Sequence, residues 1–170
     1  LQVHNTATII DQVARYELDL GLIEGNCRHP YLVVEPWVED VLVVFCAPTH
    51  RLALKGSATL AELAGELWIV RESGSGTRET LDQALRHHHF DLKVRLELEH
   101  TEAIKRAVEF GLGLGCISRL ALREAFRRGS LVAIETPELD LLRHFQFLWH
   151  RRKFQTAGMR EFIGLCRAMT

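Results

Sequence analysis

The sequence has no long hydrophobic run. Its longest uninterrupted apolar stretch, residues 41–47, is far shorter than the roughly 20 residues that a membrane-spanning helix needs. This absence argues against a helical membrane protein, and we expect no membrane partner.

An excess of charge of either sign is also missing. The chain contains 21 Lys and Arg residues against 22 Asp and Glu residues, which gives a net charge of −1. Because binding to nucleic acid normally relies on a basic surface, this piece of chain has no electrostatic preference for DNA or RNA. The short basic clusters at 127–128 and 151–153 are predicted to be solvated surface.

Cysteines are few and widely spaced. Cys27, Cys46, Cys116 and Cys166 form no CxxC pair and no zinc-type spacing. We expect small buried side chains in a reducing compartment. The alternative, a redox-sensing thiol, needs an exposed and electropositive position. Residues 87–89 are three histidines, but successive helical residues point about 100° apart and do not converge on one metal ion, so we predict no metal site.

Sequence motifs of catalytic centres and of cofactor loops are missing as well. We find no G-x-S-x-G, no HExxH and no diagnostic carboxylate pair, so we predict no catalytic residue and no enzyme. Gly111, Gly113 and Gly115 follow a predicted helix and precede a predicted strand, which is the wrong order for a cofactor loop. They are predicted to end the helix and allow close packing, and no cofactor is expected.

The composition and the apolar pattern of the sequence are typical of an α/β protein. Apolar residues make up 47% and charged residues 25%, which is typical of a globular domain of one or two lobes. Periodicity predicts strands at 1–4, 19–23, 32–34, 41–46, 67–70, 94–98, 114–117, 131–134 and 145–150. It predicts helices at 7–16, from 59, 80–90, 101–110, 120–128 and from 156, with 48–53 irregular. This alternation favours a mostly parallel sheet covered by helices on both faces.

The strongest candidate for a binding site follows the strand at 67–70. Ser73, Gly74, Ser75, Gly76 and Thr77 lead from that strand into a helix. The first N–H groups of a helix lack internal partners and lie at the positive end of its dipole, so such a turn suits an anion. The sequence therefore predicts a small anionic or polar ligand here. The alternative is an ordinary turn in which glycine serves geometry alone.

Polar side chains are also predicted at the starts of three helices. Arg78 falls in the first turn of the same helix, where a cation opposes the dipole, so we expect it to face an anionic ligand or a carboxylate. Asn5 with Thr6, and Thr101, are predicted N-caps of two further helices. The turn has neither the lysine of GxxxxGK[ST] nor the GxGxxG pattern, so it is not predicted to bind a nucleotide.

Taken in order, several segments resemble the effector-binding domain of LysR-type transcriptional regulators. The resemblance rests on residues 5–10 with 17–25, 43–53, 71–78 and 101–118, and together these span most of the chain. Arg51 departs from the usual proline. The resemblance implies an α/β fold like that of type 2 periplasmic binding proteins, with two lobes and two crossover strands. Lobe I would comprise 1–46 and 142–170, and lobe II 47–141.

The resemblance also implies a fragment. The chain begins at Leu1, so we expect the first strand and helix of lobe I, the linker helix and the DNA-binding helix-turn-helix domain to be missing. The implied function is effector sensing in a cytoplasmic bacterial transcription factor, with a small, anionic metabolite bound in the cleft between the lobes. DNA would be bound only through the missing domain, and the protein would self-associate as a dimer or tetramer.

Carried over position by position, the resemblance assigns nine effector-binding residues: Asn5, Thr6, Ser73, Gly74, Ser75, Gly76, Thr77, Arg78 and Thr101. Two alternatives stay open at this point. One is a solute-binding protein of a transport system with the same fold, and the other is an enzyme built on that fold.

Overall fold

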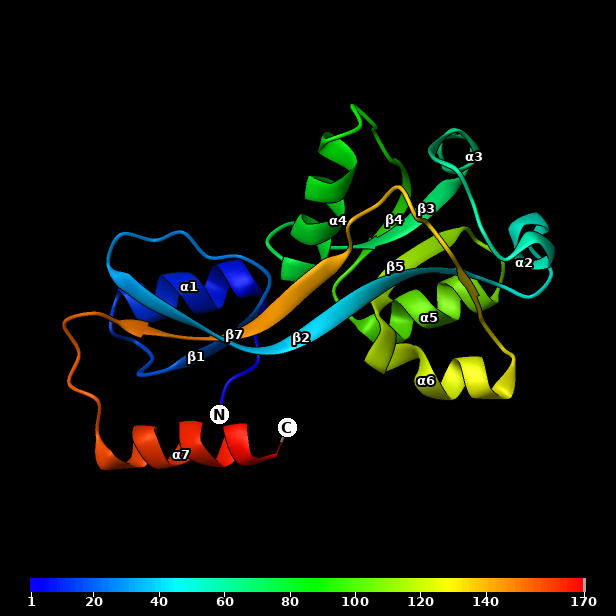
Figure 1. Cartoon of the computed structure of the whole chain (residues 1–170). Helices are drawn as coiled ribbons and strands as arrows, with labels where there is room; N and C mark the ends of the chain where they lie inside the picture. Colours follow the sequence, from blue (N-terminus) through cyan, green and yellow to red (C-terminus); the bar gives the residue numbers. More distant parts are fainter. Residues whose placement is uncertain (170) are drawn as a thin grey trace. The chain divides into compact units, whose positions relative to one another are not determined.

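The computed structural model describes residues 1–169 and alternates helices with strands along the chain (Figure 1). The helices are α1 (Thr6–Ala14), α2 (Arg51–Lys55), α3 (Leu60–Ala64), α4 (Gly76–Arg86), α5 (Thr101–Glu109), α6 (Arg119–Arg128) and α7 (Ala157–Ala168). The strands are β1 (Gly21–Glu24), β2 (Leu32–Cys46), β3 (Leu67–Arg71), β4 (Lys93–Leu98), β5 (Leu114–Ser118), β6 (Val132–Ile134) and β7 (Leu142–His150). None of the helices within residues 1–169 has the length and apolarity to cross a membrane.

The chain divides into two compact units. Unit 1 comprises Leu1–Glu39, Gly74–Gly76 and Arg143–Thr170, and unit 2 comprises Asp40–Ser73 and Thr77–Leu142. Strands β2 and β7 each contain a boundary between the units, so they are the two expected crossover strands. The first boundary between the units falls after Glu39, within β2, and the predicted strands 32–34 and 41–46 both belong to this single strand of 15 residues.

The strand pairing is mixed, so the expectation of a mostly parallel sheet was wrong. Strand β3 pairs in parallel with β4 and β5, whereas β2 is antiparallel to β5 and β6, and β1 is antiparallel to β7. The cause is the long strand β2, which enters unit 2 in the direction opposite to β3, β4 and β5. The fold remains the α/β arrangement with crossover strands that the resemblance implied.

The core of unit 1 has two layers around strand β7. Leu148 packs with Ile9 and Val13 of α1, whereas Phe147 and Trp149 pack with α7 on the other face. This division follows from the alternation of side chains along a strand. Phe147 and Trp149 therefore lie on one face of β7.

The core of unit 2 is divided by strand β3 in the same way. Trp68 and Val70 belong to one buried cluster, and Ile69 belongs to another with Ile104 and Val108 of α5. Residues 93–97 of strand β4 are all exposed. The reason is its position at the edge of the sheet, where it pairs only with β3 among the described strands.

Several helix ends follow from local capping. Thr59 forms a capping box with Glu62, and Asn5, Ser118 and Thr156 are N-caps whose side chains accept backbone N–H groups. Two predictions were wrong. Residues 1–4 form no strand, and the region 48–53 is not wholly irregular because α2 begins at Arg51.

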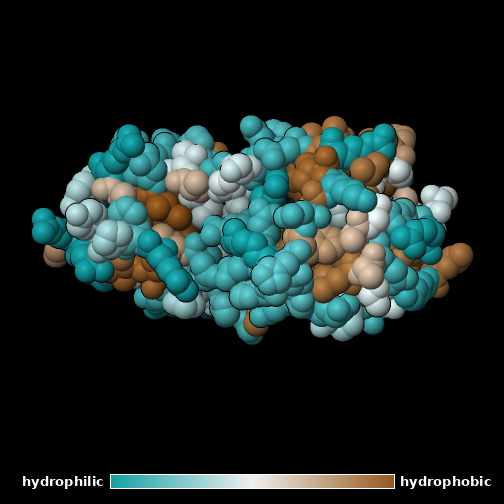
Figure 2. All heavy atoms as spheres, turned by 90° about the horizontal axis from the view of Figure 1, so that it is seen from above, coloured by the Kyte–Doolittle hydropathy of each residue, from teal (hydrophilic) through white to brown (hydrophobic). Residues whose placement is uncertain are grey.

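The surface is mostly polar on the face seen in Figure 2. Hydrophilic residues cover most of it, and hydrophobic side chains are exposed in separate places. Scattered apolar side chains of this kind are ordinary for a globular protein.

Candidate functional site

The glycine-rich turn packs directly against the start of α1 within unit 1. The N–H of Ala7 donates to the carbonyl oxygen of Gly74 at 3.0 Å. Gly74 has a φ of +87°, and a Cβ there would lie 3.1 Å from the Cβ of Ala7 and 3.3 Å from Nδ2 of Asn5. The turn therefore needs glycine for both its backbone conformation and its contact with α1.

A second glycine of the turn touches the end of β1. A Cβ at Gly76 would lie 1.8 Å from the carbonyl oxygen of Glu24 and 2.8 Å from Oγ1 of Thr6. The hydroxyl of Thr6 donates to the same Glu24 oxygen at 3.2 Å. Five of the nine predicted residues, namely Asn5, Thr6, Gly74, Ser75 and Gly76, thus belong to unit 1. Glu24 was missed, and its only signal in the sequence is its place at the end of a strand.

Backbone N–H groups in the first turn of α1 are already hydrogen-bonded within the protein. The side chain of Asn5 accepts the N–H of Thr8 at 3.0 Å, and Gly74 accepts that of Ala7. The start of α1 therefore supplies side chains rather than a row of open N–H groups. The other helix at this position, α4, begins at Gly76, which places its positive end at the turn.

Three hydroxyl-bearing residues of the site are buried, whereas Ser73 is exposed and Thr101 is half-buried. Thr6, Ser75 and Thr77 have exposed fractions of 8%, 2% and 4%. The hydroxyl of Thr6 donates to the carbonyl of Glu24, and a binding role for these three residues stays a prediction.

Arg78 lies among carboxylates of unit 2. Its Nε lies 3.0 Å from both carboxylate oxygens of Asp82, and its Nη1 donates to Glu97 at 3.1 Å and to the carbonyl of Arg71 at 3.2 Å. Glu97, which sequence reasoning missed, also accepts the N–H of Ser73 at 3.4 Å. Of the two expectations for Arg78, the structure shows the carboxylate partner. Direct contact with a ligand stays a prediction.

Thr101 stands at the start of α5, but as its first residue and not as its cap. The N-cap is His100, whose side chain makes no capping hydrogen bond. Strands β3 and β4 are parallel, with Arg71 opposite Leu98, so the residues that follow each strand emerge at one edge of unit 2. Ser73 and Thr101 follow these two strand ends, where ligands of α/β proteins commonly bind.

The structure offers no metal-binding cluster among residues 1–169. No group of three or more His, Cys, Asp or Glu side chains could hold an ion there. His88 instead binds the carbonyl of Glu138 at 2.8 Å. The four cysteines form no disulfide within residues 1–169, and burial, together with the charge of Glu66, raises the pKa of Cys46 to about 11. That thiol is therefore inert, as expected for a buried cysteine.

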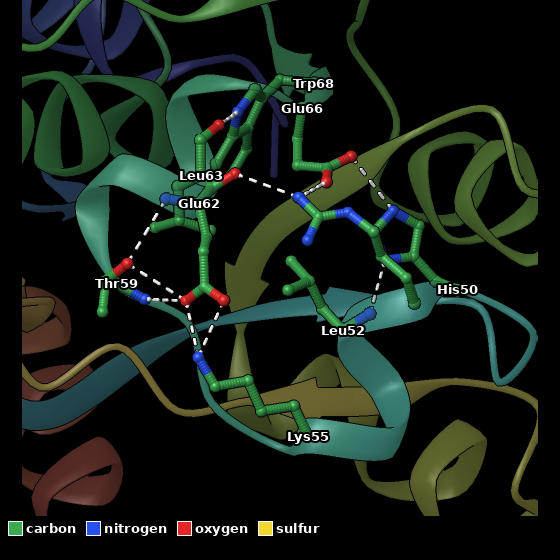
Figure 3. A network of polar contacts seen from close by, with 9 residues as sticks. His50, Leu52, Lys55, Thr59, Glu62, Leu63, Glu66 and Trp68 are labelled. Atoms are coloured by element: carbon green, nitrogen blue, oxygen red, sulfur yellow. Dashed lines mark hydrogen bonds and ion pairs between the residues drawn. The ribbon is translucent and has the colours of Figure 1, made fainter.

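A polar network in unit 2 joins the short helices α2 and α3 (Figure 3). Lys55 binds both carboxylate oxygens of Glu62 at 2.8 Å, and Thr59 completes the capping box with the same carboxylate. These hydrogen bonds lower the pKa of Glu62 to about 2, with that from Lys55 as the largest cause. Glu66 is held by Arg51 at 2.5 Å and by His50 at 3.2 Å. The network fixes local structure and lies apart from the glycine turn in the sequence.

Comparison with known proteins gives a consistent set of matches. Residues 1–170 match the family model described as the LysR substrate binding domain. The uncharacterized HTH-type transcriptional regulator YeiE of Escherichia coli (strain K12) is 40% identical over 166 residues, which cover 98% of this chain and 56% of that protein. The HTH-type transcriptional regulator CysL of Bacillus subtilis (strain 168) is 28% identical over 168 residues. The chain thus spans about half the length of the curated relatives it matches.

Solved structures agree with the sequence matches. The CcmR regulatory domain of Synechocystis PCC6803 in complex with 2-PG has a TM-score of 0.89 and 29% identity, and the alignment covers 100% of this chain and 82% of that one. The effector-binding domain of QuiR in complex with shikimate has a TM-score of 0.86 at 18% identity, covering 98% of this chain and 78% of that one. The second likeness concerns the fold alone.

Proposed function

Because the chain belongs to the LysR substrate-binding domain family, we propose that it is the effector-sensing domain of a LysR-type transcriptional regulator. The relatives are named as transcriptional regulators, which supports regulation over transport and over catalysis. The whole protein would bind DNA through a helix-turn-helix domain outside this chain. It would self-associate as a dimer or tetramer and act in the cytoplasm, where the DNA of a bacterium lies.

The proposed effector is a small, anionic metabolite that binds around the glycine turn. The observation that carries this proposal is the hydrogen bond from Ala7 to Gly74, because it joins the turn to the start of α1. The positive end of α4 and the buried hydroxyls of Thr6, Ser75 and Thr77 supply a favourable potential and polar contacts for such a ligand. The CcmR domain, which is 29% identical to this chain, supports a small ligand because its structure contains 2-PG.

Nine residues are proposed to contribute to effector binding. The turn supplies backbone and hydroxyl groups, α1 contributes the Asn5 and Thr6 side chains, and α5 contributes its first residue. The proposed set is Asn5, Thr6, Ser73, Gly74, Ser75, Gly76, Thr77, Arg78 and Thr101. Such a ligand can change the regulator only by binding one conformation more tightly than another.

Thermal melting against a panel of small anionic metabolites tests this proposal. A true effector raises the melting temperature of the chain by mass action. Ser75→Ala and Thr101→Ala are expected to reduce that rise without unfolding the domain. The matched control is Thr156→Ala, which removes the N-cap of α7 and costs about 1 kcal/mol of stability but leaves the ligand-induced rise unchanged. Equal rises in the wild type and both site variants would refute the assignment.

A further inference from the structure

A separate cavity of about 600 Å³ lies wholly within unit 2. It opens beside β2 because the chain leaves that strand and returns to it. Ile134 of β6 still pairs with Val44, but Glu135 turns away and bonds to Gly56 at 2.9 Å. The chain comes back at Leu141, whose carbonyl accepts the N–H of Leu42 at 3.0 Å. Residues 136–140 thus form an arch over the cavity.

The arch is held in place from its outer side. The carboxylate of Glu138 accepts the N–H of Leu60 at 3.0 Å, and its carbonyl binds His88 at 2.8 Å. Leu139 and Leu141 are buried in the neighbouring hydrophobic core. An arch anchored at both ends and in its middle gives a preformed cavity, whose volume falls in the range of about 300–1,000 Å³ typical of small-molecule sites.

The cavity wall carries opposite charges that do not pair with each other. Arg119, the first residue of α6, lines it together with the carboxylates of Glu135 and Asp140. Within residues 1–169, neither the Arg119 guanidinium nor the Glu135 carboxylate makes an ion pair or a hydrogen bond. The remaining wall is largely apolar, and Val41 and Leu142 are 42% and 48% exposed there.

We propose that this cavity binds a small zwitterion with an apolar side chain, that is, a hydrophobic α-amino acid. Arg119 would take the carboxylate, Glu135 the ammonium group, and Val41 with Leu142 the side chain. A zwitterion would place its carboxylate opposite Arg119 and its ammonium group opposite Glu135, while the third charged group of the wall, Asp140, accepts the N–H of Leu142 at 3.2 Å. The site is independent of the glycine turn. Val41 and Leu142 flank the places where the chain passes between the units, so occupancy would influence both crossover strands.

Calorimetry and NMR on the isotope-labelled chain with L-leucine test the proposal. We expect saturable binding, with amide shifts in residues 41–44 and 133–142. Removing either charge of the probe, in N-acetyl-L-leucine or L-leucinamide, is expected to abolish binding. Arg119→Gln and Glu135→Gln are each expected to weaken binding about tenfold or more. Arg123→Gln is the matched control, because it removes an exposed cation of the same helix that does not line the cavity, and it should bind normally.

Three results would overturn the proposal. The first is the absence of binding by L-leucine, L-isoleucine, L-valine and L-phenylalanine. The second is equal binding of L-leucine and its singly charged derivatives, which would rule out recognition of a zwitterion. The third is a set of amide shifts centred on residues 5–7 and 73–77, which would place the ligand at the glycine turn.

Discussion

His50 and Glu66 are joined by a contact of 3.2 Å between Nε2 of the ring and Oε2 of the carboxylate. The other ring nitrogen, Nδ1, accepts the N–H of Leu52 at 3.2 Å and so caps α2. A nitrogen that accepts a hydrogen bond carries no proton, so these contacts assign the ring proton to Nε2. One histidine therefore both starts a helix and orients a carboxylate.

Replacing His50 should separate these two roles. His50→Ala removes the cap and the contact with Glu66, and we expect a loss of about 1 kcal/mol or more. His50→Asn restores a capping side chain that is too short to reach Glu66, so it should recover most of the stability. Urea denaturation measures both variants. If Asn were as destabilising as Ala, capping would not be the main contribution of His50.

Glycine substitutions should have opposite effects at two positions. Gly76→Ala places a Cβ 1.8 Å from the carbonyl of Glu24, so we expect a loss of about 1–3 kcal/mol, as for overpacking, and a weaker effector response. Gly164 lies inside α7 with nothing within 4 Å of its added Cβ. Gly164→Ala should therefore stabilise the chain by about 0.5–1 kcal/mol. Chemical denaturation of both variants checks the pair, and a neutral Gly76→Ala would contradict the close packing of the turn.

Acid should destabilise unit 1 through His150. This side chain is only 5% exposed, and burial lowers its pKa below the ordinary value of 6.5. Four nearby cationic groups lower the pKa further, namely Arg152, His29, Arg151 and Lys153. As the pH falls below 6.5, the unfolded chain takes up a proton that the folded chain does not, so stability is full above 6.5 and declines toward the lowered pKa.

Melting temperatures between about pH 8 and pH 5 measure this decline. His150→Phe keeps a ring at this position but cannot be protonated, so its melting temperature should fall less steeply in the same window. Parallel pH profiles for the wild type and His150→Phe would show that another group is responsible.

The order of helices and strands could be predicted because each element carries its own periodicity and caps. Thr59 and Thr156 signal helix starts without help from distant residues. The single strand β2 could not be predicted in this way. Its middle contains Glu35, Glu39 and Asp40, and these interrupt the apolar pattern at the place where the strand passes from one unit to the other.

The candidate site was predictable in part for the same reason. The glycines and hydroxyls at 73–77 stand out in the sequence, so the turn could be found locally. Glu24 could not be found, because its role comes from a backbone carbonyl that approaches Gly76 in space. Thr101 was predicted as a cap because hydroxyl residues favour that position, yet Thr101 is the first residue of α5 and the N-cap is His100.

The tripeptide Gly74–Gly76 belongs to unit 1, although the chain on either side of it belongs to unit 2. This arrangement constrains how ligand preference could be exchanged between relatives. A glycine turn taken from a relative would have to pack against Ala7 of α1 and against the carbonyl of Glu24, to which its own residues are not adapted. A working chimera would therefore have to take the turn, the start of α1 and the end of β1 from the same relative, although these are three separate segments of the sequence.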